Sequence, residues 1–212
     1  MKIKSFTFNS FQENTYVVYD DTKECIIIDP GCYTEEERAI LKRFITSENI
    51  NPVKLINTHC HIDHILGNKF ASEQWDLELY MNKKDLPLLE NAGNIGKMYG
   101  LEYYEGSPYP KHFLTQGNPL TFGKSNFEIL FTPGHSPGHI CLYSKENNLL
   151  IAGDVLFQRS IGRTDLPGGD HSTLINSIIT QLFPLPNETQ VFCGHGPSTN
   201  LGYEKEHNPF LK

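Results

Sequence analysis

The chain has 212 residues, of which 38% are hydrophobic, and this size and composition are typical of a globular domain. Its 18 Lys and Arg against 25 Asp and Glu give a formal net charge of −7, which argues against a nucleic-acid partner because no basic patch is present. No run of about 18 apolar residues occurs, and the N-terminus lacks the apolar core of a signal peptide. The sequence therefore predicts a soluble, cytoplasmic protein with no membrane partner.

The first half of the chain carries short apolar or alternating runs bounded by turn residues, a pattern typical of β-strands. These runs lie at residues 3–8, 15–19, 25–28 and 53–57. Thr34 and Glu37 form a capping-box pattern before apolar residues at helical spacing, which predicts a helix over residues 35–47. Further helical patterns follow at residues 65–75 and 83–91.

The second half repeats the strand pattern after a Gly-, Tyr- and Pro-rich stretch at residues 92–118, which predicts a long loop or a loop–helix insertion. Strand-like runs lie at residues 127–131, 140–143, 149–152 and 190–193. Apolar residues at helical spacing from Leu174 to Phe183 predict a helix that ends at Pro184. Strands in both halves separated by amphipathic helices indicate an α+β protein with mixed sheet structure and helices outside. No linker or repeat interrupts the chain, so a single domain over residues 1–212 is predicted.

A cluster of metal-binding side chains follows the expected strand at residues 53–57. Residues 59–64 read His-Cys-His-Ile-Asp-His, which places three imidazoles and one carboxylate within six positions. Neutral imidazole nitrogens and carboxylate oxygens are the ligands that zinc and related divalent ions prefer. One short loop can present several of them to a metal. Cys60, between two of the histidines, is expected to be a buried thiol rather than a ligand.

Three further candidates, His135, Asp154 and His195, each lie just past the end of an expected strand and among Gly or Pro residues. Loops at strand ends can converge on one edge of a sheet. Together with the four residues of the first cluster they would supply seven ligands, more than one tetrahedral ion needs. Seven ligands suit two ions about 3.5 to 4 Å apart that share a carboxylate.

This ordered set of residues resembles that of the metallo-β-lactamase superfamily. The resemblance implies an αββα sandwich, in which two mixed sheets pack face to face with helices outside. It also implies two divalent ions, one held by His59, His61 and His135, the other by Asp63, His64 and His195, with Asp154 between them. Zn is the expected metal, with Fe and Mn as alternatives. Asp63 and Asp154 are the carboxylates expected to act in catalysis, and Asp29 is expected to support a metal-binding histidine.

Four stretches narrow the resemblance to the short, single-domain bacterial relatives of glyoxalase II, the hydroxyacylglutathione hydrolases. They read THCHIDHILGN, TPGHSPGHICLY, GDVLFQRSIGRTDLPGGD and CGHGPSTNLGYEKEHNPF. The likeness implies hydrolysis of a small-molecule thioester, S-D-lactoylglutathione or a related acyl thioester, by a hydroxide that bridges the two metals. It gives no oligomeric state.

Full-length glyoxalase II binds glutathione with a C-terminal helical domain, and we expect no such domain in this chain. Arg163 and the Tyr-rich insertion are therefore the expected substrate contacts. An ion pair of Arg163 with Asp165 or Asp170 is an equally good interpretation.

Two other enzyme classes stay open. The stretch from Gly162 to Asp165 also resembles persulfide dioxygenases, which use one iron held by two His and one Asp. Another hydrolase of the superfamily, such as a lactonase, is the second alternative. The acidic charge balance argues against a nuclease.

Overall fold

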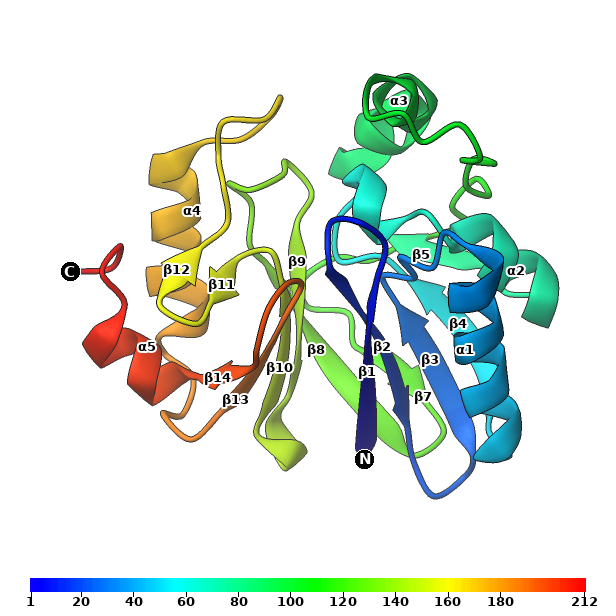
Figure 1. Cartoon of the computed structure of the whole chain (residues 1–212). Coiled ribbons are helices and arrows are strands. Elements are labelled where there is room, and N and C mark those ends of the chain that lie inside the picture. Colours follow the sequence, from blue (N-terminus) through cyan, green and yellow to red (C-terminus); the bar gives the residue numbers. More distant parts are fainter. The chain divides into compact units, whose positions relative to one another are not determined.

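The computed structural model describes all 212 residues and contains two six-stranded sheets with helices beside them (Figure 1). The chain divides into two compact units. The first unit holds residues 1–113 and 121–125, and the second holds residues 114–120 and 126–212. No helix combines the length and the apolar character that a membrane crossing requires.

The sheet of the first unit follows chain order. Its strands are β1 (Lys2–Phe8), β2 (Glu13–Tyr19), β3 (Glu24–Ile28), β4 (Asn51–Ile56), β5 (Leu79–Met81) and β6 (His112–Phe113). The first three strands pair antiparallel, and β3 to β6 pair parallel, so the sheet is mixed. Residues Ile26 to Ile28 of β3 are fully buried, as expected for a strand covered on both faces. The connections contain α1 (Glu35–Ser47), α2 (Asn68–Trp75) and α3 (Leu86–Met98).

Helix α1 begins and ends where the sequence predicts. The Thr34 hydroxyl accepts a hydrogen bond from Glu37 N at 3.3 Å, and the Glu37 carboxylate accepts one from Thr34 N at 3.0 Å. This reciprocal pair satisfies two donors that the first turn of a helix leaves open. The inward face of α1 buries Leu41 and Ile45. Glu37 also accepts a hydrogen bond from Asn9 N at 2.6 Å, which ties the β1–β2 turn to the helix.

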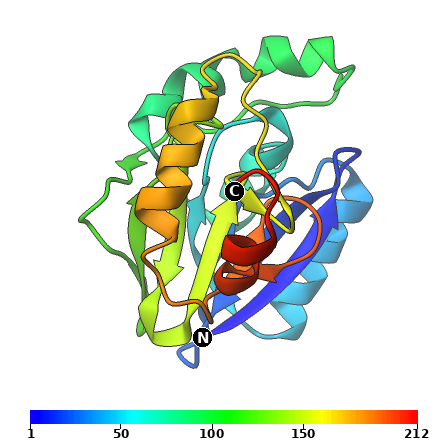
Figure 2. The same cartoon turned by 90° about the vertical axis from the view of Figure 1, so that its left-hand side faces the viewer.

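The second unit contains most of the other mixed sheet, in the order β14-β13-β10-β9-β8-β7. Its strands are β7 (Leu120–Phe122), β8 (Ser125–Phe131), β9 (Ile140–Ser144), β10 (Leu149–Gly153), β13 (Gln190–Cys193) and β14 (Thr199–Asn200). A two-stranded ribbon, β11 (Leu156–Phe157) and β12 (Ser160–Ile161), follows β10. Helices α4 (His171–Ser177), which continues into a π-helical turn, and α5 (Leu201–His207) lie on one face of the sheet (Figure 2). Leu174, Ile178 and Leu201 from these helices are fully buried in the core of the unit.

A buried carboxylate at the end of β2 fastens the β2–β3 turn to the start of β8. Asp20 accepts hydrogen bonds from Thr22 N and Oγ1 at 2.9 and 2.5 Å, from Lys124 N at 2.8 Å and from Ser125 Oγ at 2.8 Å. Burial acts to raise the pKa of Asp20, but these hydrogen bonds outweigh it and lower the pKa to about 2. The folded state therefore favours the charged form of this carboxyl.

We expect an acid-sensitive contribution to stability from Asp20. Because its folded pKa lies below the ordinary value of 3.8, the contribution is full at higher pH and is lost as the pH falls from about 4 toward 2. Asp20→Asn should lower the free energy of unfolding near neutral pH by about 1 kcal/mol more than it does at about pH 2.5. Urea denaturation at both pH values measures the difference, and Asp21→Asn at the exposed neighbouring position is the control. An equal cost at both pH values would contradict the expectation.

Candidate metal centre

The first unit gathers the four predicted ligands of residues 59–64 in the loop that follows β4. His59 and His64 are fully buried, and His61 and Asp63 are partly buried. The ligand atoms of His59 and His61 lie within 4.8 Å of each other. His64 Nε2 lies 3.7 Å from Asp63 Oδ2. A short 3-10 turn at residues 62–64 brings Asp63 and His64 together, so one loop presents all four groups.

Asp29 and Thr58 orient two of these imidazoles. Asp29 accepts hydrogen bonds from Thr58 N at 2.7 Å and from Thr58 Oγ1 at 2.6 Å, and its Oδ2 lies 3.2 Å from His64 Nδ1. His64 therefore donates through Nδ1, and its Nε2 carries the lone pair that a metal requires. His59 Nδ1 lies 3.1 Å from Thr58 Oγ1, whose proton is committed to Asp29. The same tautomer follows for His59. Asp29 contacts His64 at the position that its predicted supporting role requires, and that role stays a prediction.

Three more side chains hold the backbone of the loop, and sequence reasoning missed all of them. Asp85, which is fully buried, accepts a hydrogen bond from Cys60 N at 3.0 Å. Asn57 Nδ2 donates to His64 O at 3.2 Å. Asn9 Nδ2 donates to Asp63 O at 3.0 Å. Asn9 and Asp85 lie far from the loop in the sequence and carry no local pattern that could have revealed them.

Cys60 is a buried thiol, as expected. Its Sγ lies 3.6 Å from Met81 Sδ, and burial raises the pKa of the thiol well above its usual range. A thiol that stays protonated is a poor metal ligand.

The second unit brings together the other three predicted ligands around a single carboxylate oxygen. Asp154 Oδ2 lies 3.4 Å from His135 Nε2 and 3.5 Å from His195 Nε2. His135 follows the end of β8, Asp154 follows β10 and His195 follows β13. An oxygen almost equidistant from two imidazole nitrogens fits a carboxylate that two metal ions share.

The second unit also fixes the orientation of these groups. His135 Nδ1 lies 2.7 Å from Arg163 O, so it donates to this carbonyl and leaves the lone pair on Nε2. Asp154 N donates to His139 Nε2 at 3.1 Å, and His139 Nδ1 lies 3.2 Å from Thr132 Oγ1. With both ring nitrogens engaged by protein groups, His139 supports Asp154 rather than binding metal.

Gly162 permits a close approach that no other residue would allow. A Cβ at this position would collide with Asp154 O and would lie 3.1 Å from His135 Nδ1. The loop that carries Arg163 O can therefore reach His135 only with glycine at this position.

The side chain of Arg163 forms an ion pair with Asp165, two residues further along the chain. Its Nε and Nη2 each donate to an oxygen of Asp165 at 2.7 Å, and both side chains are exposed. The hydrogen bonds from Arg163 lower the pKa of Asp165 to about 2. The ion pair that the sequence offered as an alternative for Arg163 is thus present, while its role as a substrate contact stays a prediction.

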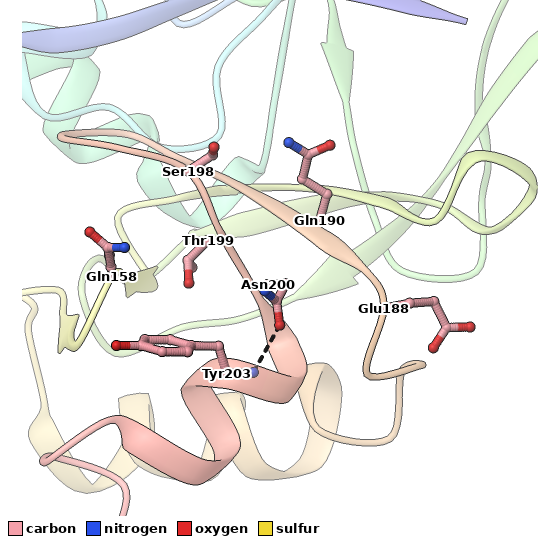
Figure 3. A pocket seen from close by; sticks show the side chains of 7 residues that line it. All are labelled: Gln158, Glu188, Gln190, Ser198, Thr199, Asn200 and Tyr203. Carbon is pink, nitrogen blue, oxygen red and sulfur yellow. Dashed lines mark hydrogen bonds between the residues drawn. The ribbon is translucent and has the colours of Figure 1, made fainter.

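A surface pocket of about 500 Å³ lies elsewhere on the second unit (Figure 3). Polar side chains of β13, β14 and the neighbouring loops line it together with Tyr203 of α5. None of the seven predicted ligands borders this pocket.

The donor set of both units fits divalent metal ions. Imidazoles with their Nε2 lone pairs available and carboxylates are the ligands that Zn and Fe take in hydrolytic sites, and no thiolate competes with them. Second hydrogen-bond partners of the kind that Asp29 and Arg163 O provide are typical of metal-binding histidines.

Residues 9–195 match the model of the metallo-β-lactamase superfamily, and the chain therefore belongs to that superfamily. It is 39% identical over 212 residues to the hydroxyacylglutathione hydrolase GloC of Haemophilus influenzae, and the alignment covers 100% of this chain and 98% of the relative. The crystal structure of the B3 metallo-β-lactamase BLEG-1 superposes with a TM-score of 0.91 at 38% identity and covers 100% of both chains. That of TTHA1623 in a di-iron-bound form gives 0.88 at 38% identity, covering 98% of this chain and 100% of the other.

These similarities confirm the predicted family and the α+β fold class, which is that of the metallo-β-lactamase fold. The protein is a metallo-hydrolase of this superfamily, whose members bind divalent metals through His and Asp clusters. The identity of the metal is a separate question, because one similar structure holds two irons.

Proposed function

We propose that this metallo-hydrolase is a cytoplasmic thioester hydrolase of the glyoxalase II type, acting on S-D-lactoylglutathione or a related acyl thioester. The observation that carries the proposal is the full-length similarity to GloC of Haemophilus influenzae, in a chain that has all seven predicted metal ligands. Similarity to a β-lactamase structure at 38% identity makes β-lactams the second substrate class to test.

The proposal includes two divalent ions at the seven residues predicted from the sequence. The ligands of the first are His59, His61 and His135, those of the second are Asp63, His64 and His195, and Asp154 serves both. When bound, such ions supply a hydroxide nucleophile at neutral pH and polarise the carbonyl under attack.

The chain's own residues prepare the site for this chemistry. Asp29 and Arg163 O accept hydrogen bonds from the Nδ1 atoms of His64 and His135, which leaves Nε2 of each imidazole as the atom that can face a metal ion. Asp63 is the carboxylate proposed to accept a proton during turnover. A thiolate leaves readily because its conjugate thiol has a pKa of about 8.5, so no general acid is required.

Arg163 is the proposed contact for the carboxylate of the thiol carrier, which requires it to exchange its exposed partner Asp165 for substrate. Arg163→Ala should raise KM for the glutathione thioester about tenfold and leave kcat within about twofold, because uniform binding is lost. Steady-state kinetics measures both values, and Arg43→Ala at an exposed position of α1 is the matched control. An unchanged KM would remove Arg163 from the binding site.

A substrate panel tests the proposed activity. Protein loaded with Zn or Fe is offered S-D-lactoylglutathione, a second acyl-glutathione, a lactone, a β-lactam and, with oxygen monitored, glutathione persulfide. Preferred turnover of the acyl-glutathiones supports the proposal. Oxygen consumption on the persulfide with one iron per chain, or preferred turnover of the lactone or the β-lactam, would replace it with that activity.

A further inference from the structure

A fully buried carboxylate lies outside the predicted ligand set. Glu204 of α5 is completely inaccessible to solvent. It accepts hydrogen bonds from Thr199 Oγ1 at 2.6 Å, from Arg159 N at 2.8 Å and from Asn208 Nδ2 at 2.8 Å. Three donors from three segments compensate the cost of burying the carboxylate. Glu204 thus joins strand β14, the β11–β12 turn and the end of α5.

Asn208, which follows the last residue of α5, makes the second connection. Its Nδ2 also donates to Ser160 O at 3.0 Å, and its backbone N donates to Glu204 O at 3.0 Å. Glu204 and Asn208 both lie in the last of the glyoxalase II-like stretches, which ends at Phe210. Their hydrogen bonds connect this stretch to the β11–β12 turn, in addition to the predicted metal ligand His195 that it carries. We call the pair Glu204 and Asn208 the α5 clamp.

The α5 clamp holds the end of the loop that carries His195 and the turn that follows Phe157, whose ring packs against His195. The loop that carries His195 begins at Gly194, whose N donates to Gly153 O at 2.7 Å, and it ends at Thr199. The ring of Phe157 packs edge-on against the imidazole of His195, with the ring centroids 6.2 Å apart and the planes at 74°. Phe157 belongs to β11, two residues before the point at which Glu204 holds the turn.

The turn after Phe157 requires this support. Arg159 has a φ of +56°, in the left-handed region that non-glycine residues rarely adopt. Such a conformation persists only where surrounding contacts determine it, and the hydrogen bond from Arg159 N to Glu204 is one such contact.

We propose that Glu204 is a positioning residue that fixes the imidazole of His195 for its metal ion. The proposal rests on the proposed function, which makes His195 a ligand. Glu204 touches no reacting group. It acts through Thr199 on the end of the loop and through Arg159 on the ring that packs against His195. Loss of the α5 clamp lets the imidazole leave the orientation that the ion requires.

Three variants separate geometry from charge. Glu204→Ala removes all three hydrogen bonds. Glu204→Gln can keep all three, because its amide oxygen can face the two N–H donors while its amide nitrogen donates to the Thr199 hydroxyl. Glu206→Ala is the matched control on the same helix, since the side chain of Glu206 is 76% exposed.

The first readout is hydrogen exchange over residues 193–200 in the metal-free protein, which does not depend on any metal. The second is titration of the metal-free protein with Co(II), followed by the absorption of the bound ion. In Glu204→Ala we expect faster exchange in this segment and affinity for one of two equivalents reduced tenfold or more, with the other equivalent unchanged. Glu204→Gln and Glu206→Ala should behave like the wild type.

The outcomes distinguish this proposal from the proposed function. Wild-type exchange and wild-type affinity for both equivalents in Glu204→Ala would overturn the positioning role. Wild-type protein that binds fewer than two Co(II) would overturn the two-ion assignment. Hydrogen exchange over residues 193–200 would then still show whether the α5 clamp holds the loop of His195. If Glu204→Ala does not fold, Thr199→Val and Asn208→Ala, each of which removes only part of the network, decide by the same two readouts. No change in either variant would overturn the proposal.

Discussion

Asp154→Ala is expected to lower the metal content from two ions per chain to one or none and to reduce thioester hydrolysis about a thousandfold or more. The reason lies in the geometry of one oxygen, because Asp154 Oδ2 lies 3.4 Å from His135 Nε2 and 3.5 Å from His195 Nε2. Alanine removes the negative charge that would serve both ions at once. Elemental analysis of the purified variant and its kcat on S-D-lactoylglutathione measure the two effects.

Asp165→Ala is the matched control for Asp154→Ala. It removes a carboxylate from the same unit at a position 68% exposed and outside the predicted ligand set. Its metal content should equal that of the wild type. A metal content of two ions per chain in Asp154→Ala would contradict the shared role of this carboxylate.

Asp29→Ala has the second largest expected effect and acts on both stability and metal binding. It leaves the buried Thr58 N and Oγ1 without their acceptor and removes the partner of His64 Nδ1. We expect a loss of about 3 kcal/mol in the free energy of unfolding and a 10- to 100-fold loss of metal affinity. Urea denaturation of the metal-free protein and metal titration measure the two quantities separately.

Two further variants show which part of the Asp29 effect comes from the carboxylate. Asp29 has a φ of +49°, and Asp76, an exposed residue at the end of α2, has a φ of +54°. Asp76→Ala therefore reports the cost of alanine in this backbone conformation without loss of a buried acceptor. Asp29→Asn suits the conformation but offers fewer acceptors, so it should regain part of the stability and little of the metal affinity. Full metal affinity in Asp29→Asn would show that the charge at Asp29 does not matter.

The sequence predicts well those elements that are long enough to show a periodic pattern or that begin with a capping residue. Helix α1 matches its predicted range, because the capping box of Thr34 and Glu37 marks its start and buried Leu41 and Ile45 mark its inner face. The longer strands agree with the apolar runs to within one or two residues. Helix α3 extends to Met98, seven residues beyond its predicted end, into the stretch expected to be a loop or a loop–helix insertion.

The short elements leave no periodic signal. Strands of two or three residues, such as β11, β12 and β14, are too short to show alternation, and they form because neighbouring strands supply their hydrogen bonds. Helix α5 has seven residues, of which Leu201 and Glu204 are buried, so its inward face carries a charge where an apolar residue would be expected. The hydrogen bonds that Glu204 accepts from Thr199, Arg159 and Asn208 explain why a carboxylate occupies this position.

In the candidate site, too, some residues can be predicted from the sequence and others cannot. The candidate ligands can be found in the sequence, because His and Asp cluster at strand ends where Gly and Pro allow the chain to turn. The side chains that hold the backbone of the loop at residues 59–64 could not be predicted, because Asn9 and Asp85 contact it from other parts of the chain. Asp29 is the exception, since it directly follows a predicted strand, as the ligands do.

The most direct test is a titration of metal-free protein with Zn, in which hydrolysis of S-D-lactoylglutathione is followed after each addition. A thioester hydrolase with seven ligands for two ions should show no activity without metal, and its activity should rise until about two equivalents are bound. Hydrolysis by the metal-free protein at the rate of the loaded protein would contradict the central claim.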